Sequence, residues 1–308
     1  MSPYMSFTFA QAVARHRSSA RVAVIEHSGA IQAFLPFETS GQKTAVPIGH
    51  PMNDLQGFIG SGAPIDARAV IRKSGLRGWY FHHAPANQEC LSPYYHLGST
   101  VRAPVIDIGS GYESYVGGHT RPGARRLSEK KRALERRLGS ISLMWRSSDA
   151  GHFGQLIRWK SGKYGGAERF FSAEPGALKI VQDIATSDSE DCAGVLSVLC
   201  AGEQVVAAHL GLLGPVGLCS WMPSYDPDLS RFSPGLLMWM PLIEEASERD
   251  VARIDLGYGQ HSYKFDLAND SYPVAGGAIW ASKLEQQAWK VYRRFRYGRR
   301  IIHKRAPD

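Results

Sequence analysis

The sequence has little of what marks several common protein classes. Its 308 residues include four cysteines and no CxxC pair, which excludes a disulfide framework and the usual cysteine-based zinc sites. No apolar run approaches the roughly 20 residues that span a bilayer, and the first residues lack the basic and apolar segments of a secretory leader. We therefore expect a cytoplasmic protein that holds no metal.

Several motifs of well-known chemistry are missing as well. The chain has neither a GxSxG nucleophile motif nor a GxxxxGK[ST] phosphate loop, so hydrolase and phosphoryl-transfer functions lose their main support. His82, His83 and His96 have no companion ligands at the spacing of a metal site. No recognised DNA- or RNA-binding motif is present, which makes nucleic acid an unfavoured partner.

The net charge of +8 is concentrated in two segments. Residues 121–137 carry eight Lys or Arg against two Glu, and residues 283–308 carry nine against two acids, so the remaining chain is net negative. Each segment is either a solvated helix face or a surface for an anionic partner. The second segment predicts a basic amphipathic helix, which would bind a nucleotide or the inner face of an anionic membrane, or would pack its aromatic side chains on a sheet.

The 44% of hydrophobic residues are distributed as in an α/β protein. Ser28-Gly29 and Ala201-Gly202 each separate two β-rich runs and predict hairpins. Residues 121–137 predict a basic helix with Ser128 as a cap, followed by a strand near Ile141. Further on, the pattern predicts a helix at 175–185, a strand at 216–223, a helix at 236–250, a strand at 253–257, a polar loop at 258–270 and a last strand.

The segment from Tyr225 to Gly259 carries the most information about function. Ser233-Pro234-Gly235 is a favourable helix start, because Ser can cap, Pro loses only an unpaired amide, and Gly allows a ligand to approach the backbone. Free amides at such a start suit a pyrophosphate, and Arg231 adds a positive charge. Many helices begin this way without binding an anion, so the motif alone is weak.

The order of motifs in this region resembles the GNAT superfamily of acyltransferases. It is similar in particular to the cellulose-biosynthesis-associated CelD/BcsL-like group and, more distantly, to Fem-type transferases. The resemblance rests on these motifs: Ser224-Tyr225-Asp226-Pro227, Ser233-Pro234-Gly235, Asp255-Leu256-Gly257-Tyr258-Gly259, Tyr263-Lys264, Ile157-Arg158-Trp159-Lys160 and Val206-Ala207-Ala208-His209-Leu210. It is dense over residues 156–281 and looser over 22–111.

The resemblance implies a mixed sheet in each of two tandem GNAT-like halves. The predicted domains are a degenerate half at 1–120, a basic connecting helix and strand at 121–150, the acyltransferase domain at 151–282, and a basic tail at 283–308. An acceptor is expected in the cleft between the halves.

The donor implied by the resemblance is acyl-CoA, with acetyl-CoA as the first choice. The predicted donor loop consists of Arg231, Phe232, Ser233, Pro234, Gly235 and Leu236. It departs from the usual GNAT loop, because both glycine positions of that loop are substituted. Fem-type relatives use aminoacyl-tRNA with the same fold, so the loop alone leaves the donor open.

Amine acylation requires a base, an acid for the leaving thiolate and a polarised carbonyl. His261 is the predicted base, since unperturbed imidazoles titrate near neutrality, and Tyr258 is the predicted acid. The Fem-type pattern implies that Lys264 stabilises the oxyanion or an anionic substrate group, the alternative being a surface lysine. Six further residues are candidates for substrate binding, although a structural role is open for several of them: Trp159, Lys160, His209, Tyr225, Asp255 and Tyr263.

Together these features predict an N-acyltransferase that acts on an amine-bearing small molecule, glycan or lipid precursor. The resemblance points to an amino sugar of an exopolysaccharide or envelope glycan, as in cellulose biosynthesis. A long-chain base is the alternative acceptor. The alternative from another class is a degenerate GNAT-like module that binds an anionic nucleotide, lipid or glycan-assembly partner.

Overall fold

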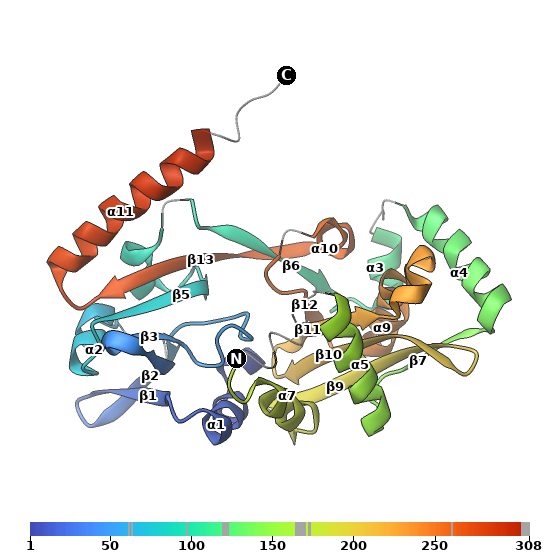
Figure 1. The fold of residues 1–308 in the computed structure, drawn as a ribbon, viewed down its shortest axis with the longest axis horizontal. Helices are drawn as coiled ribbons and strands as arrows, with labels where there is room; N and C mark the ends of the chain where they lie inside the picture. The colour runs from blue at the N-terminus through green and yellow to red at the C-terminus, as the bar shows by residue number, and fades with distance from the viewer. Residues whose placement is uncertain are drawn as a thin grey trace. The chain divides into compact units, whose positions relative to one another are not determined.

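The computed structural model describes residues 1–308 with the exception of 61, 63, 97, 119–122, 164–170, 172–173, 260 and 303–308, and without the side chains of 162–163 and 293–302. The chain forms two compact units. Unit 1 consists of Met1–Arg17 and Ala103–Tyr272, and unit 2 consists of Ser18–Arg102 and Pro273–Asp308. Figure 1 labels the elements.

The sheet of unit 1 is mixed. Its strands run in this order: β6 (Val101–Asp107), β12 (Arg253–Asp255), β11 (Gly217–Tyr225), β10 (Gln204–Gly214), β9 (Cys192–Ala201) and β7 (Ile141–Met144), with β8 (Asp188–Ser189) paired to β9. The pair β11–β12 is parallel, and β6–β12, β9–β10 and β10–β11 are antiparallel.

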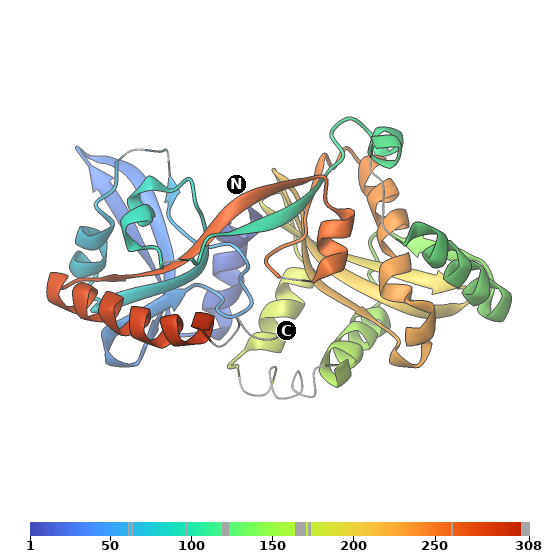
Figure 2. The same cartoon turned by 90° about the horizontal axis from the view of Figure 1, so that it is seen from above.

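Helices cover both faces of the central strands of unit 1. The helices of unit 1 are α1 (Phe7–His16), α3 (Tyr112–Gly118), α4 (Ala124–Leu138), α5 (Ala150–Lys163), α7 (Ala177–Ala185), α8 (Pro234–Leu237), α9 (Trp239–Ser247) and α10 (Ser262–Leu267), with 3-10 turns η1 (Pro3–Met5) and η4 (Pro227–Phe232). Helices α5 and α7 contact β9–β11 (Figure 2). Trp239 and Leu242 of α9 share a buried cluster with Val195 and Leu218 of the sheet. This double cover explains why β9 is an almost continuous apolar run.

Unit 2 also has a mixed sheet. Its strands run β1 (Ala20–His27), β2 (Ala30–Ser40), β3 (Thr44–Pro47), β5 (Gly78–Pro85) and β13 (Asp270–Trp280), with β4 (Ile59–Gly60) on β2, and β3–β5 is the parallel pair. The remaining elements of unit 2 are α2 (Ala67–Lys73), α11 (Lys283–Ile302), η2 (Gly41–Lys43) and η3 (Glu89–Tyr94). The predicted α/β class with a mixed sheet is therefore confirmed in both units.

Both predicted hairpins are present. Ser28 and Gly29 join β1 to β2 with φ of 51° and 78°, the left-handed backbone that a two-residue hairpin turn requires. The turn at Gly202-Glu203 joins β9 to β10, and there Gly202 has the positive φ, 57°. Local turn residues predict both connections, and the Gly202 amide also donates to the Ser140 carbonyl.

Two local predictions were wrong. Ser128 does not cap a helix: α4 begins at Ala124, and the Ser128 hydroxyl donates to the Ala124 carbonyl from inside that helix. The stretch predicted as a polar loop contains α10, because Tyr263 packs against the cluster around Trp239 and gives the segment a buried side.

The units and the predicted domains have different boundaries, since each unit combines two separate segments of the chain. Within unit 2, α11 packs Trp289 against His96 and Tyr80, with ring centroids 4.4 and 6.3 Å apart. Tyr292 is exposed. Phe295 and the basic side chains from Arg293 onward, which carry much of the predicted anionic-partner surface, lie outside the described side chains.

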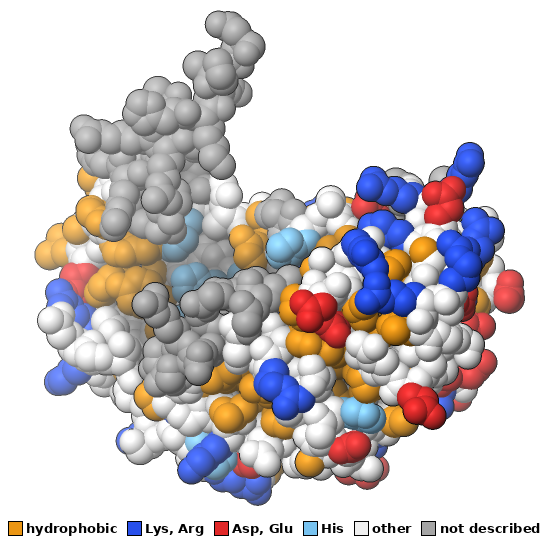
Figure 3. Space-filling view, turned by 45° about the vertical axis from the view of Figure 1, so that its right-hand side comes forward, with side chains coloured by type: hydrophobic (Ala, Val, Ile, Leu, Met, Phe, Trp, Pro, Cys, Tyr) orange, Lys and Arg blue, Asp and Glu red, His pale blue; other side chains and the backbone are white. Residues whose placement is uncertain are grey.

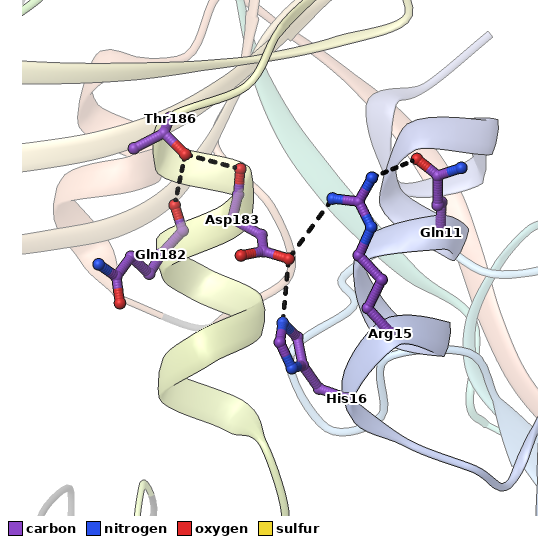
Figure 4. A network of polar contacts seen from close by, with 6 residues as sticks. All are labelled: Gln11, Arg15, His16, Gln182, Asp183 and Thr186. Atoms are coloured by element: carbon purple, nitrogen blue, oxygen red, sulfur yellow. Dashed lines mark hydrogen bonds and ion pairs between the residues drawn. The ribbon is translucent and has the colours of Figure 1, made fainter.

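A polar network joins α1 to α7 in unit 1 (Figure 4). Asp183 Oδ2 lies 2.9 Å from His16 Nε2 and 3.7 Å from Arg15 Nη1, and Arg15 also donates to Gln11. These side chains keep 21% to 59% of their surface exposed, so solvent screens their attraction.

Substitution of Asp183 by asparagine is expected to lower the free energy of unfolding by at most about 1 kcal/mol, because surface ion pairs contribute little. Urea unfolding at low and high salt measures the effect, which shrinks at high salt. Gln182→Glu is a control of opposite charge change on the same turn. A loss of several kcal/mol in Asp183→Asn would contradict the screened description.

Candidate functional site

Strands β11 and β12 separate in the middle of the unit 1 sheet. Within the described residues they pair only through Leu218 with Ile254 and Cys219 with Asp255. Beyond this point β11 continues from Ser220 to Tyr225 alongside β10, and the chain after Asp255 turns into the loop before α10. One edge of β11 is therefore left without a strand partner from β12.

A bulge and a buried polar pair mark the start of this open edge. The β10–β11 register shifts between Leu210 and Gly211, so Trp221 has no residue opposite it. His209 Nε2 lies 3.0 Å from Ser220 Oγ, and His209 is 1% exposed. Burial, together with the nearby Lys160 ammonium, lowers the pKa of His209 to about 3, so the imidazole is neutral. Its Nδ1 atom is buried without a hydrogen-bond partner in the described structure.

The loop after β12 is held by Asp255 and Lys264. Asp255 accepts hydrogen bonds from the Gly257 amide at 2.8 Å and from Tyr272 Oη at 2.5 Å. Burial raises the pKa of Asp255, and these two hydrogen bonds partly oppose the rise. Lys264 is 8% exposed, and its Nζ donates to the carbonyls of Gly257 and Tyr258. Both residues fix the loop that carries Tyr258 and His261, whose side chains are exposed.

The segment before α9 departs from the predicted helix start. Ser233 occupies the position before α8, but it has φ 55° and its side chain caps no amide. Its hydroxyl instead accepts a hydrogen bond of 2.6 Å from Lys130 Nζ of α4. Arg231 places its guanidinium 4.7 Å from the ring centroid of Phe232. Gly235 packs against Tyr225, so its missing side chain serves packing within the protein.

Substitution of Gly235 by alanine is expected to lower the free energy of unfolding by about 1–3 kcal/mol, as overpacking does elsewhere. The added Cβ would lie 2.8 Å from Cδ1 of the Tyr225 ring, and a rigid ring can relieve this only by moving. Thermal or urea unfolding measures the change. Gly154→Ala on α5 is the matched control, because nothing lies within 4 Å of the added methyl group and alanine favours a helix.

A pocket of about 310 Å³ lies between α4, the start of α9, and α10. Its walls are mostly apolar, with Leu127 from α4, Leu236 and Met240 from the α8–α9 segment, and Leu267 from α10. Polar and charged groups also line it: Ser128, Lys131, Glu244 and Asp266. Such a pocket suits a ligand with an apolar body and a few polar atoms.

Aromatic rings connect this pocket to the separated strands. Trp239 and Tyr263 both line the pocket, and their ring centroids are 6.2 Å apart. Trp239 also meets His209 edge-on at 5.4 Å, and Tyr263 meets His261 at 6.1 Å. The rings form a series from the buried imidazole of His209 to the exposed imidazole of His261.

The structure brings some of the predicted site residues together and leaves others apart. Leu236, from the predicted donor loop, and Tyr263, from the predicted substrate residues, line the same pocket. Trp159 is buried in α5, and Lys160 Nζ lies 3.5 Å from the Pro223 carbonyl of β11. Neither of these α5 residues lines the pocket, and the roles predicted for the separate residues stay predictions.

The sequence prediction missed the contribution of α4 and α9 to this pocket. On α4, Ala124, Leu127, Ser128 and Lys131 line it at the i, i+3, i+4, i+7 spacing of one helix face. That spacing is the signal that could have found them. The described residues contain no group of three or more His, Cys, Asp or Glu able to hold a metal ion, and none of the described helices has the length and apolarity to cross a membrane.

A family model described as an acetyltransferase (GNAT) domain matches residues 122–265, which run from α4 into α10. No curated protein sequence matches the chain.

Three solved structures share the fold over most of the chain. FemX has a TM-score of 0.58 at 11% identity, covering 91% of this chain and 93% of its own. The C-terminal DUF2156 domain of a proposed lysylphosphatidylglycerol synthetase from Agrobacterium fabrum has 0.56 at 11%, covering 90% and 89%. L-PGS from Bacillus licheniformis has 0.55 at 12%, covering 92% and 90%. Residues 122–265 thus match a GNAT acetyltransferase domain, and the protein is an acyltransferase with an α/β GNAT fold.

Proposed function

We propose that the protein transfers an acyl group from acyl-CoA to an amine, with the pocket between α4, α9 and α10 as part of the donor site. The observation that carries this proposal is the lining of the pocket. Leu236 of the predicted donor loop and Tyr263, a predicted substrate-binding residue, come from separate parts of the sequence and line one cavity.

The residues of the site match the parts of acyl-CoA in polarity and charge. The apolar walls suit an acyl or pantetheine chain, and the open edge of β11 offers backbone groups that can pair with pantetheine amides as a strand would. Lys130, Lys131 and Arg231 supply positive charge for phosphates. The carboxylates of Glu244 and Asp266 disfavour phosphates near α9 and α10.

The reaction forms an amide and releases a thiol. The amine nitrogen attacks the thioester carbon, the C–S bond breaks, and the leaving thiolate takes a proton. In our proposal His261, directly or through a water, accepts the proton lost by the amine, and Tyr258 donates a proton to the thiolate. Lys264 acts on this step through the loop: it holds the carbonyls of Gly257 and Tyr258 and so positions the tyrosine.

The proposed acceptor is an amino sugar of an exopolysaccharide or envelope glycan. The resemblance of the motifs to the CelD/BcsL-like group supports this choice. A long-chain base, giving an N-acylated lipid, is the alternative acceptor. Incubation with acetyl-CoA or a longer acyl-CoA and either glucosamine or a long-chain base, followed by mass spectrometry of the products, distinguishes the two.

Filling the pocket is expected to weaken acetyl-CoA binding at least tenfold, a change of about 1.4 kcal/mol or more in binding free energy. Ser128→Trp places an indole on the α4 wall, and because Ser128 is exposed the fold should persist. Calorimetric titration of both proteins with acetyl-CoA measures the change.

Arg136→Trp adds the same ring to an exposed position of α4 that does not line the pocket, and it should bind like the wild type. Arg231→Ala tests the donor loop in parallel. Absence of acyl-CoA binding by the wild-type protein would contradict the proposed donor and favour an aminoacyl donor or a binding module.

A further inference from the structure

Helix α4 carries far more positive charge than its own acids neutralise. It has seven Lys or Arg and two Glu. Two ion pairs are formed within it, Arg125 with Glu129 and Lys131 with Glu135 at 3.9 Å. Within the described part of the chain, no carboxylate pairs with Lys130 or with the exposed Arg126, Arg132, Arg136 and Arg137. In Figure 3 blue side chains gather over the part of unit 1 that carries α4.

Apolar contacts fix this basic helix beside the segment that leads into α9. Leu134 is fully buried in a cluster with Phe232, Leu237 and Met238, and Leu127 and Leu138 pack against the same cluster. Figures 1 and 2 show α4 alongside this segment. The position of its basic side chains is therefore set by a packed core, which reduces the entropy lost when they bind a ligand.

Lys130 is held where an anion could reach it. Its ammonium donates one hydrogen bond to Ser233 Oγ at 2.6 Å, and its side chain is half-buried. An ammonium has three donors, and the described residues use one of them. A half-buried cation without an acidic partner favours an anionic ligand, because a ligand phosphate would restore the hydrogen bonds lost with water.

Lys131, the next residue along the helix, lines the pocket itself. Its partner Glu135 is 3.9 Å away and about half of the Lys131 side chain is exposed, so the ion pair is weak and can exchange for a phosphate. Lys131 thus places one ammonium group on the α4 wall of a mainly apolar cavity, and Lys130, the preceding residue of the helix, places a second one outside that lining, at Ser233. The opposite walls carry the acids Glu244 and Asp266.

We propose that α4 is the phosphate-binding wall of the donor site, with Lys130 and Lys131 binding the phosphates of acyl-CoA while its apolar part enters the pocket. This inference rests on the proposed function. In this proposal, side chains of α4 make the charge contacts with the phosphates. Without them, a backbone loop alone would have to make these contacts. The loop before α8 lacks the usual glycines, and its Ser233 hydroxyl already accepts a hydrogen bond from Lys130. This contact is consistent with phosphate binding shared between the loop and α4.

This placement also gives the donor a direction. Phosphates are attracted to the α4 wall and repelled from the acids on α9 and α10, so the other end of the molecule points to the aromatic side of the pocket. Trp239 and Tyr263 lie on that side, and Tyr263 adjoins His261. The thioester would then face the loop proposed to carry the proton transfers.

The test compares two double variants of equal charge change. Lys130→Gln/Lys131→Gln removes the proposed contacts, and Arg136→Gln/Arg137→Gln removes two exposed charges from the end of the same helix. Each protein is titrated with acetyl-CoA and with S-acetylpantetheine, which has the thioester and no phosphate. We expect the lysine double variant to bind acetyl-CoA at least tenfold more weakly, to bind S-acetylpantetheine unchanged, and to lose most of the salt dependence of acetyl-CoA binding. The arginine double variant should match the wild type.

Equal acetyl-CoA affinity in the lysine double variant and the wild type would contradict the proposed phosphate-binding role of α4. It would not contradict the proposed acyltransferase function. An equal loss in both double variants would also contradict the phosphate-binding role, because a general charge effect would then suffice. If the lysine variant lost binding to phosphatidylglycerol vesicles and kept its acetyl-CoA affinity, the wall would serve a lipid and the inference would be wrong. Failure of the wild type to bind acetyl-CoA in any form would instead contradict the proposed function.

Discussion

Substitution of His261 by glutamine should lower kcat by about a hundredfold or more and leave acetyl-CoA affinity unchanged, because positioned bases contribute roughly that much to proton transfer. His261 is exposed, so its replacement should not disturb the fold, and its ring adjoins Tyr263, which lines the pocket. Glutamine keeps a polar side chain of similar length but cannot accept the amine proton. Steady-state rates with acetyl-CoA and the acceptor that turns over fastest, beside calorimetric affinities, separate kcat from binding.

His27→Gln is the matched control, since His27 is an exposed histidine on β1 of unit 2. Added imidazole should partly restore the rate of a His261→Gly variant, which a purely structural role would not allow. A normal kcat in His261→Gln would transfer the proton-accepting role to water or to a tyrosine of the same loop.

The elements that the sequence predicted correctly depend on local chemistry. The hairpins at Ser28-Gly29 and Gly202 follow from turn residues, and the strands of unit 1 follow from apolar runs long enough to be recognised. The errors at Ser128 and in the loop before β13 have the opposite origin. Whether Ser128 caps a helix depends on where that helix begins, and α10 forms because Tyr263 finds a buried partner far away in sequence.

The composition of the site could be predicted only in part, for the same reason. Sequence motifs singled out Leu236 and Tyr263, but they could not show that α4 completes the pocket, since that depends on Leu134 packing against Phe232 and Met238. The contact between Lys130 and Ser233 joins residues 103 positions apart, and no local pattern encodes it. Glycine at 235 was attributed to ligand approach, whereas the structure uses it to admit the Tyr225 ring.

Substitutions of His209 are expected to have a large effect on the free energy of unfolding. Truncation to alanine should lower the free energy of unfolding by about 3 kcal/mol or more, because it opens a cavity under Trp239 and leaves the buried Ser220 hydroxyl without its partner. Glutamine can keep a hydrogen bond to Ser220 and should cost about 1–2 kcal/mol at pH 8. Urea unfolding of the three proteins gives these differences, and Asp183→Asn sets the scale of a screened surface contact.

The dependence on pH isolates the imidazole itself. Its pKa is about 3 in the folded protein and near 6.5 when the chain is unfolded, so between these values only the unfolded chain binds the proton. The contribution of the neutral histidine to stability is therefore complete above pH 6.5 and is lost as the pH falls toward 3. By pH 5 the loss amounts to about 2 kcal/mol. His209→Gln cannot take up this proton. The advantage of about 1–2 kcal/mol that the wild type has over the variant at pH 8 should therefore fall by about 2 kcal/mol, so that it vanishes or changes sign by pH 5. A gap that stays constant over this range would mean that His209 becomes protonated in the folded protein, and that water or the donor reaches Nδ1 at the start of the open edge of β11.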